Sequence, residues 1–192
     1  MTYNNKYNAL DKIIASFRSK EIKKNINLKN KKILDFGCGS NFRELKERYR
    51  ECANVSLVDK IGDNFNNQDN FNFIHFDGNI SKLDKILPNK YYDHIFLLAV
   101  VEHLDHPENI LNILKKKLTN NGFIFLTAPG KKSKWILEFM AYRLKIINAE
   151  LVKEHKRYYN LDEYNKLSAL TNMNIIKFYF FELGLNTVCL LK

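Results

Sequence analysis

The sequence predicts an α/β fold with a doubly wound, mostly parallel sheet of seven strands, and three observations predict it. Short apolar runs alternate with helical patterns along most of the 192 residues. Three of these runs are each followed by an acidic residue, and the first opens into a pair of glycines. The last two runs follow each other directly, which indicates a C-terminal antiparallel hairpin strand added to the parallel ones.

The first element is a helix before the core. Apolar residues recur at Leu10, Ile13, Ile14 and Phe17, and this spacing predicts an amphipathic helix over residues 7–24. Apolar runs then predict five strands, at 31–37, 54–59, 71–76, 93–100 and 122–128. Helical patterns between them predict helices at 41–50, 81–87 and 107–119.

Local signals also set the starts of the later helices and the positions of the last two strands. Pro107 stands at the first position of its helix, where its missing N–H is not needed. Asn160 begins another helix, which runs to about Leu170. The last two strands are expected at 174–182 and 186–191, joined at Gly184.

Length and composition favour one domain over residues 1–192. Within it, residues 1–28 form an N-terminal helical extension and residues 131–159 a lid insertion. No stretch has the length and apolarity of a signal peptide or a membrane span, so a cytoplasmic protein is expected. The three cysteines show no metal-ligand spacing, so we expect reduced thiols and no metal.

The net charge of +10 invites a nucleic-acid partner. Lysine supplies most of the positive charge, and asparagine and isoleucine are also frequent, as AT-rich coding bias produces without any partner. Lysines cluster at 23–32, 115–117 and 131–134, and only the last cluster lies near the presumed site. Nucleic acid is therefore possible but not favoured.

The most informative segment is Asp35-Phe36-Gly37-Cys38-Gly39. Glycine tolerates positive φ and has no Cβ, so the chain can turn sharply and approach a bound nucleotide or nucleoside closely. Asp59 ends the next strand twenty residues later, where an acid can accept hydrogen bonds from ribose hydroxyls. Asp77 follows the third strand. A single acid after a strand is commonly a turn residue or a helix cap, but three at successive strand ends favour a ligand site.

With these motifs the chain resembles class I S-adenosylmethionine-dependent methyltransferases, of the small bacterial kind with little beyond the core fold. The resemblance runs from about residue 30 to 192. It includes ILDFGCGS, VDK, HFDG, YYDHIFLLAVVEHLDHPENIL and LTNNGFIFLTAP. It implies a Rossmann-like fold, S-adenosyl-L-methionine as cofactor, and transfer of its methyl group. One departure is Asn41, where the family commonly has a third glycine.

The resemblance also implies roles for particular residues. Asp35 would hold the ammonium of the cofactor directly or through water, Asp59 the ribose, and Asp77 the adenine amine. The whole cofactor-binding set is Asp35, Gly37, Cys38, Gly39, Asp59, Lys60, Asp77, Gly78 and Leu98. Cys38 is expected to pack rather than to react.

Residues 131–154 should determine the methyl acceptor. They begin with lysines and continue WILEFMAYRLKIINAEL, which is apolar on most of its circumference. A lid over the substrate, including Trp135, is the favoured interpretation. A homodimer contact and shallow peripheral membrane contact are the alternatives.

Residues 154–159, at the end of the lid insertion, carry the candidate catalytic base. If the acceptor is a hydroxyl, a base with a near-neutral pKa helps, and His155 is the prediction. Tyr158 and Tyr159 could orient a substrate or fill the underside of the lid, and His103 is a further candidate substrate contact.

A metal-assisted enzyme is the second interpretation. Glu102 and His103 form an EHL sequence similar to that of the enzymes that methylate the terminal 2′-hydroxyl of small RNAs. Those enzymes carry another glutamate three residues earlier, where this chain has Ala99, so a site made of Glu102, His103 and His155 would hold one carboxylate.

The expected function is therefore methylation of a small polar acceptor, such as a hydroxyl of a sugar or of a glycan or secondary-metabolite intermediate. An RNA 2′-O-methyltransferase and a cofactor-binding scaffold without turnover are the alternatives. The chain could be a monomer or a homodimer.

Overall fold

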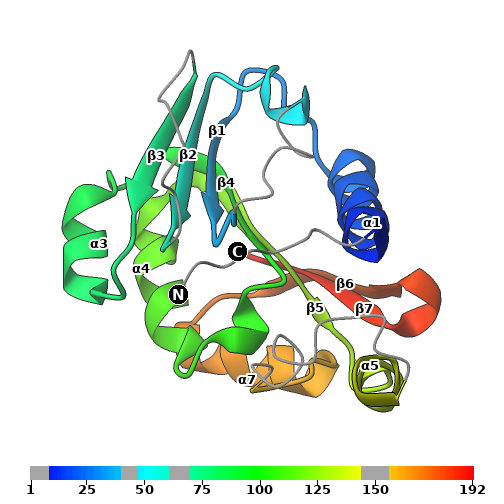
Figure 1. Cartoon of the computed structure of the whole chain (residues 1–192). Coiled ribbons are helices and arrows are strands. Elements are labelled where there is room, and N and C mark those ends of the chain that lie inside the picture. Colours follow the sequence, from blue (N-terminus) through cyan, green and yellow to red (C-terminus); the bar gives the residue numbers. More distant parts are fainter. Residues whose placement is uncertain (1–8, 40–46, 61–69, 144–155) are drawn as a thin grey trace.

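The computed structural model describes residues 9–39, 47–60, 70–143 and 156–192, and it contains the predicted seven-stranded sheet (Figure 1). The strand order is β3-β2-β1-β4-β5-β7-β6. The first five of these are parallel, and β7 runs antiparallel to both β5 and β6. The predicted fold class, a Rossmann-like α/β sheet with a C-terminal antiparallel hairpin, is confirmed.

All of the predicted strands are present. They are β1 Lys32–Phe36, β2 Asn54–Asp59, β3 Phe71–His75, β4 Tyr92–Leu98, β5 Leu118–Pro129, β6 Ile175–Phe181 and β7 Asn186–Leu191. The described helices are α1 Ala9–Asn25, α3 Ile80–Ile86, α4 Pro107–Lys117, α5 Ser133–Glu138 and α7 Leu161–Thr171. Two 3-10 turns, η1 Val101–His103 and η3 Glu182–Gly184, and one π-helical turn, η2 Phe139–Arg143, complete them.

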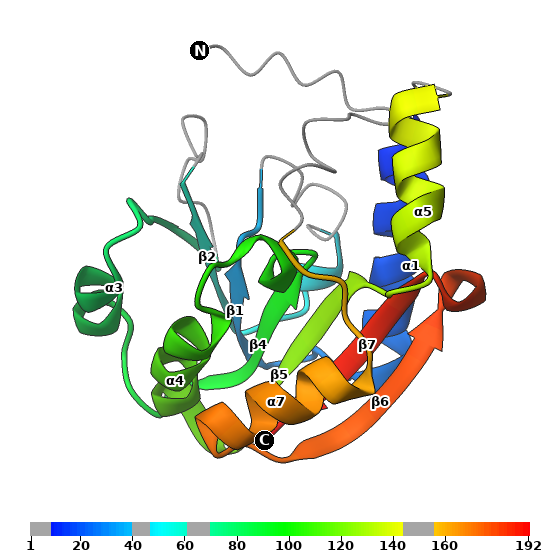
Figure 2. The same ribbon diagram turned by 90° about the horizontal axis from the view of Figure 1, so that it is seen from below.

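Helices cover both faces of the sheet (Figures 1 and 2). Successive residues of a strand point to opposite faces, so Ile33 packs on the α1 side while Leu34 packs on the side of α3, α4 and α7. Ile22 and Ile26 bury α1 against the first face. Each face therefore has its own apolar core, and the strand ends are left to form the rim.

At the described end of α1, the buried side chains do not include the predicted Phe17. Phe17, expected on the apolar face, is 42% exposed, while Ser19, Ile22 and Ile26 are buried. The side chains of the earlier predicted positions, 10, 13 and 14, lie outside the described residues. Of the four predicted apolar positions, Phe17 is the one that the structure describes, and it lies on the exposed side of the helix.

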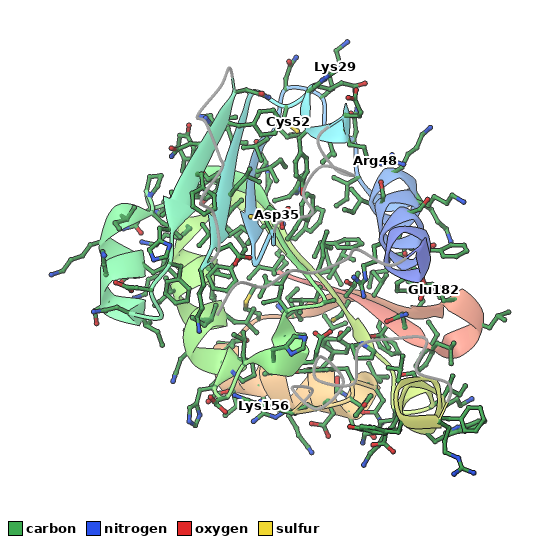
Figure 3. All side chains as sticks on the ribbon, in the orientation of Figure 1. Lys29, Asp35, Arg48, Cys52, Lys156 and Glu182 are labelled. Carbon is green, nitrogen blue, oxygen red and sulfur yellow. The ribbon has the colours of Figure 1, made fainter. Side chains whose placement is uncertain are left out.

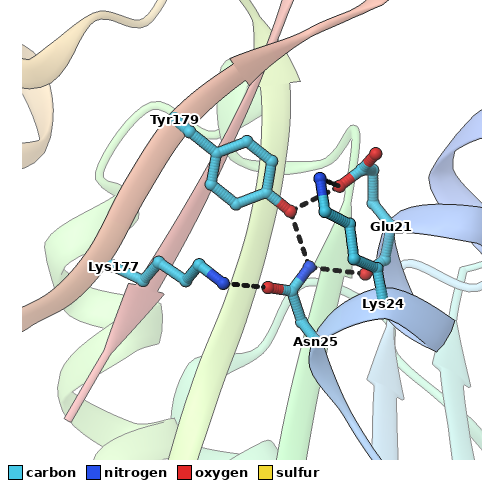
Figure 4. Close-up of polar contacts among 5 residues, drawn as sticks. All are labelled: Glu21, Lys24, Asn25, Lys177 and Tyr179. Atoms are coloured by element: carbon cyan, nitrogen blue, oxygen red, sulfur yellow. Dashed lines mark hydrogen bonds and ion pairs between the residues drawn. The ribbon is translucent and has the colours of Figure 1, made fainter.

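Polar contacts with β6 fix α1 instead (Figure 4). The Tyr179 hydroxyl donates to Glu21 Oε2 at 2.5 Å and accepts from Asn25 Nδ2 at 2.6 Å. Lys177 Nζ donates to Asn25 Oδ1 at 2.7 Å, and Lys24 Nζ lies 4.0 Å from Glu21 Oε2. The later helix residue, Asn25, bonds to the earlier strand residue, Lys177, while Glu21 bonds to Tyr179. Helix α1 therefore runs antiparallel to β6, and its N-terminal end lies toward the end of that strand.

The fifth strand starts earlier than predicted and α4 ends earlier. Lys117, expected within the helix, is buried, and its Nζ contacts Asp84 Oδ1 at 2.7 Å. Leu118 then pairs with Tyr92. A Cβ at Gly122 would lie 2.9 Å from the Asp93 carbonyl oxygen, so glycine allows the close approach that continues this strand past an irregularity in β4.

Candidate functional site

The strand ends that carry the predicted acids lie on one edge of the sheet. In register, Phe36 of β1 pairs with Val58 of β2, and Asp59 of β2 pairs with His75 of β3. Because these strands are parallel, the residues that follow them meet at the same rim. Asp59 and Asp77 therefore lie on one edge, as the sequence predicts.

The glycine turn after β1 is bonded to the acid of β2. Gly37 and Gly39 have φ of +76° and +60°, in the region that glycine adopts without strain. The Gly37 N–H donates to the Val58 carbonyl at 2.7 Å, and the Gly39 N–H donates to Asp59 Oδ2 at 2.7 Å. The turn and the half-buried Asp59 form one preorganised unit.

Gly37 has a second reason to be glycine. A Cβ at this position would lie 2.4 Å from Val100 Cγ2. The sequence reasoning attributes the absent Cβ to ligand approach, but this space is occupied by Val100 from the end of β4. A ligand can therefore approach the turn only through the backbone of the turn and at Gly39, and not through the space beside the Gly37 Cα.

Asp35 lies inside the protein rather than at the rim. It is 1% exposed, and the Tyr49 hydroxyl donates to its Oδ2 at 2.9 Å. Burial raises the pKa of Asp35 to about 7, against the lowering effect of the Tyr49 hydrogen bond, and the negative charge of Asp59 adds to the rise. The contact of Tyr49 with Asp35 was not predicted from the sequence. The only sign of it there is that an aromatic residue stands in the helical pattern before β2.

Asp77 is engaged as a turn residue. Its Oδ1 accepts from the Asn79 N–H at 2.9 Å, and its Oδ2 accepts from Lys82 Nζ at 3.0 Å. These two hydrogen bonds hold the pKa of Asp77 below its usual range. The carboxylate is exposed, which leaves lone pairs that can also accept from a ligand.

The remaining predicted cofactor contacts differ in exposure. Lys60 and Gly78 are exposed at the ends of β2 and β3, while Leu98 is half-buried at the end of β4. Cys38 is also half-buried, and burial raises the pKa of its thiol far above its usual range. This thiol stays protonated, which agrees with a packing role.

The turn after β4 brings a later segment to the rim. Glu102 is 1% exposed, and burial raises the pKa of its carboxyl to about 7. The Lys156 N–H donates to the Glu102 carbonyl at 2.9 Å, and the Tyr159 hydroxyl donates to the Val101 carbonyl at 3.2 Å. Residues 156–159 therefore run along the ends of β4 and β5, and the predicted base His155 lies outside the described residues.

The two tyrosines of this segment have different surroundings. Tyr159 is fully buried, and its ring lies 5.0 Å from that of Tyr164, so its contacts favour packing over substrate contact. Tyr158 is half-buried, and burial raises the pKa of its hydroxyl. His103, on the same turn as Glu102, is also half-buried. Tyr158 and His103 are thus the better placed candidates.

The predicted lid begins as a helix with an exposed aromatic side. Trp135, Phe139 and Tyr142 are 67%, 49% and 46% exposed. Trp135 and Phe139 are four residues apart, a spacing that puts both on one side of α5, and Tyr142 follows in η2. Figure 2 shows α5 leaving the end of β5 and extending beyond the sheet. The rest of this segment, 144–154, lies outside the described residues.

Two further features bear on the chemistry. Within the described ranges, no group of three or more His, Cys, Asp or Glu side chains is arranged to hold a metal ion. A cavity of about 990 Å³ lies between α1 and residues 47–51, lined by Ser19, Lys23 and Arg48 among others. This cavity includes none of the acids at the strand ends.

The fold and the site define a class of protein. An open, mostly parallel sheet whose first turn is glycine-rich and bonded to the acid of the second strand is a nucleotide- or nucleoside-binding α/β architecture. No helix in the described part of the chain combines the length and apolarity that crossing a membrane requires.

Comparisons with known proteins identify the family. The family model for a methyltransferase domain matches residues 7–177. A search of curated proteins gave no match. The chain belongs to the methyltransferase domain family, and the enzyme class that the sequence predicts is confirmed.

Solved structures share the fold at low identity. A SAM-dependent methyltransferase from Archaeoglobus fulgidus has a TM-score of 0.64 and 18% identity, over 92% of this chain and 93% of that one. A SAM-dependent methyltransferase from Leishmania major has a TM-score of 0.66 and 14% identity, over 95% and 74%. A SAM-dependent methyltransferase from Aquifex aeolicus has a TM-score of 0.62 and 16% identity, over 90% and 88%.

Proposed function

We propose that the chain uses S-adenosyl-L-methionine to methylate a hydroxyl of a small polar acceptor. The observation that supports the cofactor most directly is the bond from the Gly39 N–H to Asp59 Oδ2, which joins the glycine turn to the acid of the next strand. The structural neighbours named above are SAM-dependent enzymes, and their likeness to this fold supports the same choice.

The residues at the rim suit the groups of this cofactor. The carboxylates of Asp59 and Asp77 are hydrogen-bond acceptors for the ribose hydroxyls and the adenine amine. Phe76, half-buried and next to Asp77 in the chain, packs on the buried ring of Phe36 with a centroid distance of 5.4 Å, so it is the apolar side chain nearest in sequence to this acid. Asp35 is buried behind the turn, so its charge would act on the ammonium through water or through the backbone.

When bound, the cofactor supplies a methyl group activated by a sulfonium. The chain's own work is to align the acceptor, to exclude water and to receive the acceptor's proton. His155 is the proposed base, with His103, Trp135 and Tyr158 as proposed acceptor contacts. The proposed acceptor is a hydroxyl of a sugar or of a related intermediate, and this choice is made by fold-level analogy alone.

Cofactor binding is tested by isothermal titration calorimetry. Wild-type protein should bind S-adenosylmethionine, and Asp59→Ala should bind about 10- to 100-fold more weakly, since a hydrogen bond to a charged group contributes about 1.5–3 kcal/mol. Asp162→Ala is the matched control, because this exposed acid lies in the first turn of α7 and not at the strand ends.

Two results would overturn parts of the proposal. No binding by wild-type protein would refute the cofactor, and equal binding by Asp59→Ala would refute the role of this acid. Methyl-labelled cofactor then identifies the acceptor class: label in RNA that depends on magnesium would favour the metal-assisted alternative. Binding without any transfer of label would favour a scaffold.

A further inference from the structure

The cavity between α1 and residues 47–51 has the size of a small-molecule site. Its volume of about 990 Å³ lies at the upper end of the range of roughly 300–1,000 Å³ that such sites have. Ile26 and Leu28 supply a buried apolar part of its lining. The other described residues that line it carry hydroxyl, amide or charged side chains. This lining favours a polar ligand over an apolar one.

This cavity lies away from the carboxyl ends of the strands. Residues 25–28 and Glu51 of its lining stand just before β1 and β2 in the chain. The Asn30 N–H donates to the Glu51 carbonyl at 2.8 Å and joins these two segments. Asp59 and the glycine turn stand at the other ends of the same two strands. A ligand in the cavity would therefore lie toward the opposite edge of the sheet from the proposed cofactor site.

Arg48 meets this cavity in a fixed orientation. Its Nε donates to the Oγ of Ser19, a residue of α1 that is 5% exposed and also lines the cavity. Figure 3 shows Arg48 beside α1. The hydrogen bonds and ion pairs among the described residues leave Arg48 Nη1 and Nη2 without a partner. A guanidinium held by its Nε offers two parallel N–H donors, which match two oxygens of a phosphate.

Some of the charges that line the cavity are paired within the protein. Lys24 Nζ lies 4.0 Å from Glu21 Oε2. Glu47 Oε2 lies 2.8 Å from Arg50 Nη1. Each of these pairs joins residues three positions apart in the chain, so neither of them requires a ligand.

The remaining charges of the lining are not paired. Lys23 and Arg48 have no carboxylate within 4.0 Å among the described residues, and Glu51 has no cation there. Two positive charges therefore stand against one negative charge in the cavity. Like charges that face one hollow repel each other, and an anion bound between them removes this repulsion.

A phosphate monoester suits these groups better than a carboxylate or a phosphodiester does. It carries a charge of about −1.5 to −2 at pH 7 and three strong acceptor oxygens, which serve both free N–H groups of Arg48 and the ammonium of Lys23. A carboxylate or a phosphodiester carries a single charge. Glu51 is an acceptor, and a hydroxyl next to the phosphate can donate to it without adding a charge.

We propose that this cavity binds a phosphorylated sugar or polyol, with its phosphate on Arg48 and Lys23 and a hydroxyl on Glu51. This site goes beyond the proposed function, because its lining contains none of the residues assigned to the cofactor or to the acceptor. The bound molecule is a second ligand of the protein, held away from the edge of the sheet where the methyl group would be transferred.

The test is isothermal titration calorimetry with three matched probes: glucose 6-phosphate, glucose and inorganic phosphate. Each is titrated at constant ionic strength in a buffer without phosphate. Glucose 6-phosphate should bind at least about 10-fold more tightly than glucose, which lacks the charge-assisted hydrogen bonds. It should bind about 3-fold more tightly than inorganic phosphate, which lacks the hydroxyl for Glu51.

Three substitutions locate the site. Arg48→Gln should weaken binding of glucose 6-phosphate about 10-fold, since it removes the two oriented donors. Lys23→Gln should weaken it about 3-fold, because this lysine is exposed and has no contact whose loss could unfold the protein. Lys20→Gln is the matched control: it removes the same charge from an exposed position of α1 that does not line the cavity, and it should bind like wild type.

The other outcomes each overturn the inference. No binding of glucose 6-phosphate would mean that the cavity takes no such ligand, and equal binding of inorganic phosphate would remove the sugar from it. An equal loss with Lys20→Gln and Lys23→Gln would indicate attraction to the basic surface in general. Binding should persist with S-adenosylmethionine at saturation, and its loss would place the phosphate at the cofactor site. Titration of the cofactor alone tests the proposed function separately, so the two failures are distinguishable.

Discussion

The substitution Gly37→Ala tests whether the turn after β1 is fixed by the packing of Val100. The φ of +76° costs an alanine about 1–2 kcal/mol. The new Cβ, 2.4 Å from Val100 Cγ2, must displace a side chain at the end of β4, and such overpacking costs about 1–3 kcal/mol. The smaller entropy of the unfolded alanine chain offsets about 0.4–1 kcal/mol, so the free energy of unfolding should fall by about 1–4.5 kcal/mol.

Gly78→Ala separates the two causes. Gly78 has φ of +94°, but an added Cβ would meet no atom within 4 Å. The free energy of unfolding of Gly78→Ala should therefore fall only by the backbone effect, about 1 kcal/mol. Adding Val100→Ala to the Gly37→Ala protein should recover about 1–2 kcal/mol relative to additivity, because the two sites are in contact.

The assay is urea unfolding followed by circular dichroism, with all proteins at one pH. The proteins are wild type, Gly37→Ala, Gly78→Ala, Val100→Ala and the double variant Gly37→Ala/Val100→Ala. The reasoning is refuted if Gly37→Ala and Gly78→Ala agree within about 0.5 kcal/mol, or if the Val100→Ala effects simply add. Calorimetry on the same proteins shows whether cofactor affinity falls with the displaced turn.

Three further predictions concern titration, a buried lysine and the lid. Asp35 and Glu102 have a pKa of about 7 in the folded protein and near 4 in the unfolded chain. Between these pH values the folded state therefore binds more protons than the unfolded state. The free energy of unfolding should fall from about pH 4.5 to 7, by at most about 1.4 kcal/mol per pH unit for each group. Asp35→Asn should reduce this slope in urea melts, and an unchanged slope would contradict it. Lys117→Met should lower the free energy of unfolding by about 1–3 kcal/mol, because it removes the contacts of Lys117 Nζ with the Asp84 carbonyl, Asp84 Oδ1 and Asn89 Oδ1. In the same assay, Lys116→Met should lower it by less than about 1 kcal/mol, because Lys116 is exposed. Trp135→Ala should change the free energy of unfolding by no more than about 0.5 kcal/mol, because the side chain is 67% exposed, yet raise the KM for the acceptor; a large loss of stability would show a packing role.

The lysine clusters show why composition alone does not name a partner. Lys115 Nζ donates to the carbonyls of Thr171 and Asn172 at the end of α7, at 3.1 and 2.6 Å. Lys117 is buried against Asp84. Lys116 Nζ also lies 3.7 Å from Asp84 Oδ2, so all three lysines in this run have structural partners that no charge count reveals. Only side-chain geometry separates them from a surface for nucleic acid.

The sequence by itself determined the order of strands and helices, the glycine turn and the acids at strand ends. Alternating apolar runs and turn residues are local properties, and parallel strands joined by helices leave few topologies. It therefore predicted that Asp59 and Asp77 share an edge. Local patterns also located the hairpin at Gly184, because glycine adopts positive φ without strain, and Gly184 has φ of +88°.

Only the tertiary structure decided which side chains meet. The burial of Asp35 behind Tyr49, the occupation of the Gly37 space by Val100, and the face of α1 that contacts the sheet all depend on residues far apart in the chain. The bond between Glu21 of α1 and Tyr179 of β6 joins two segments that no spacing in the sequence relates. Such contacts depend on how distant segments pack together, which local propensity cannot encode.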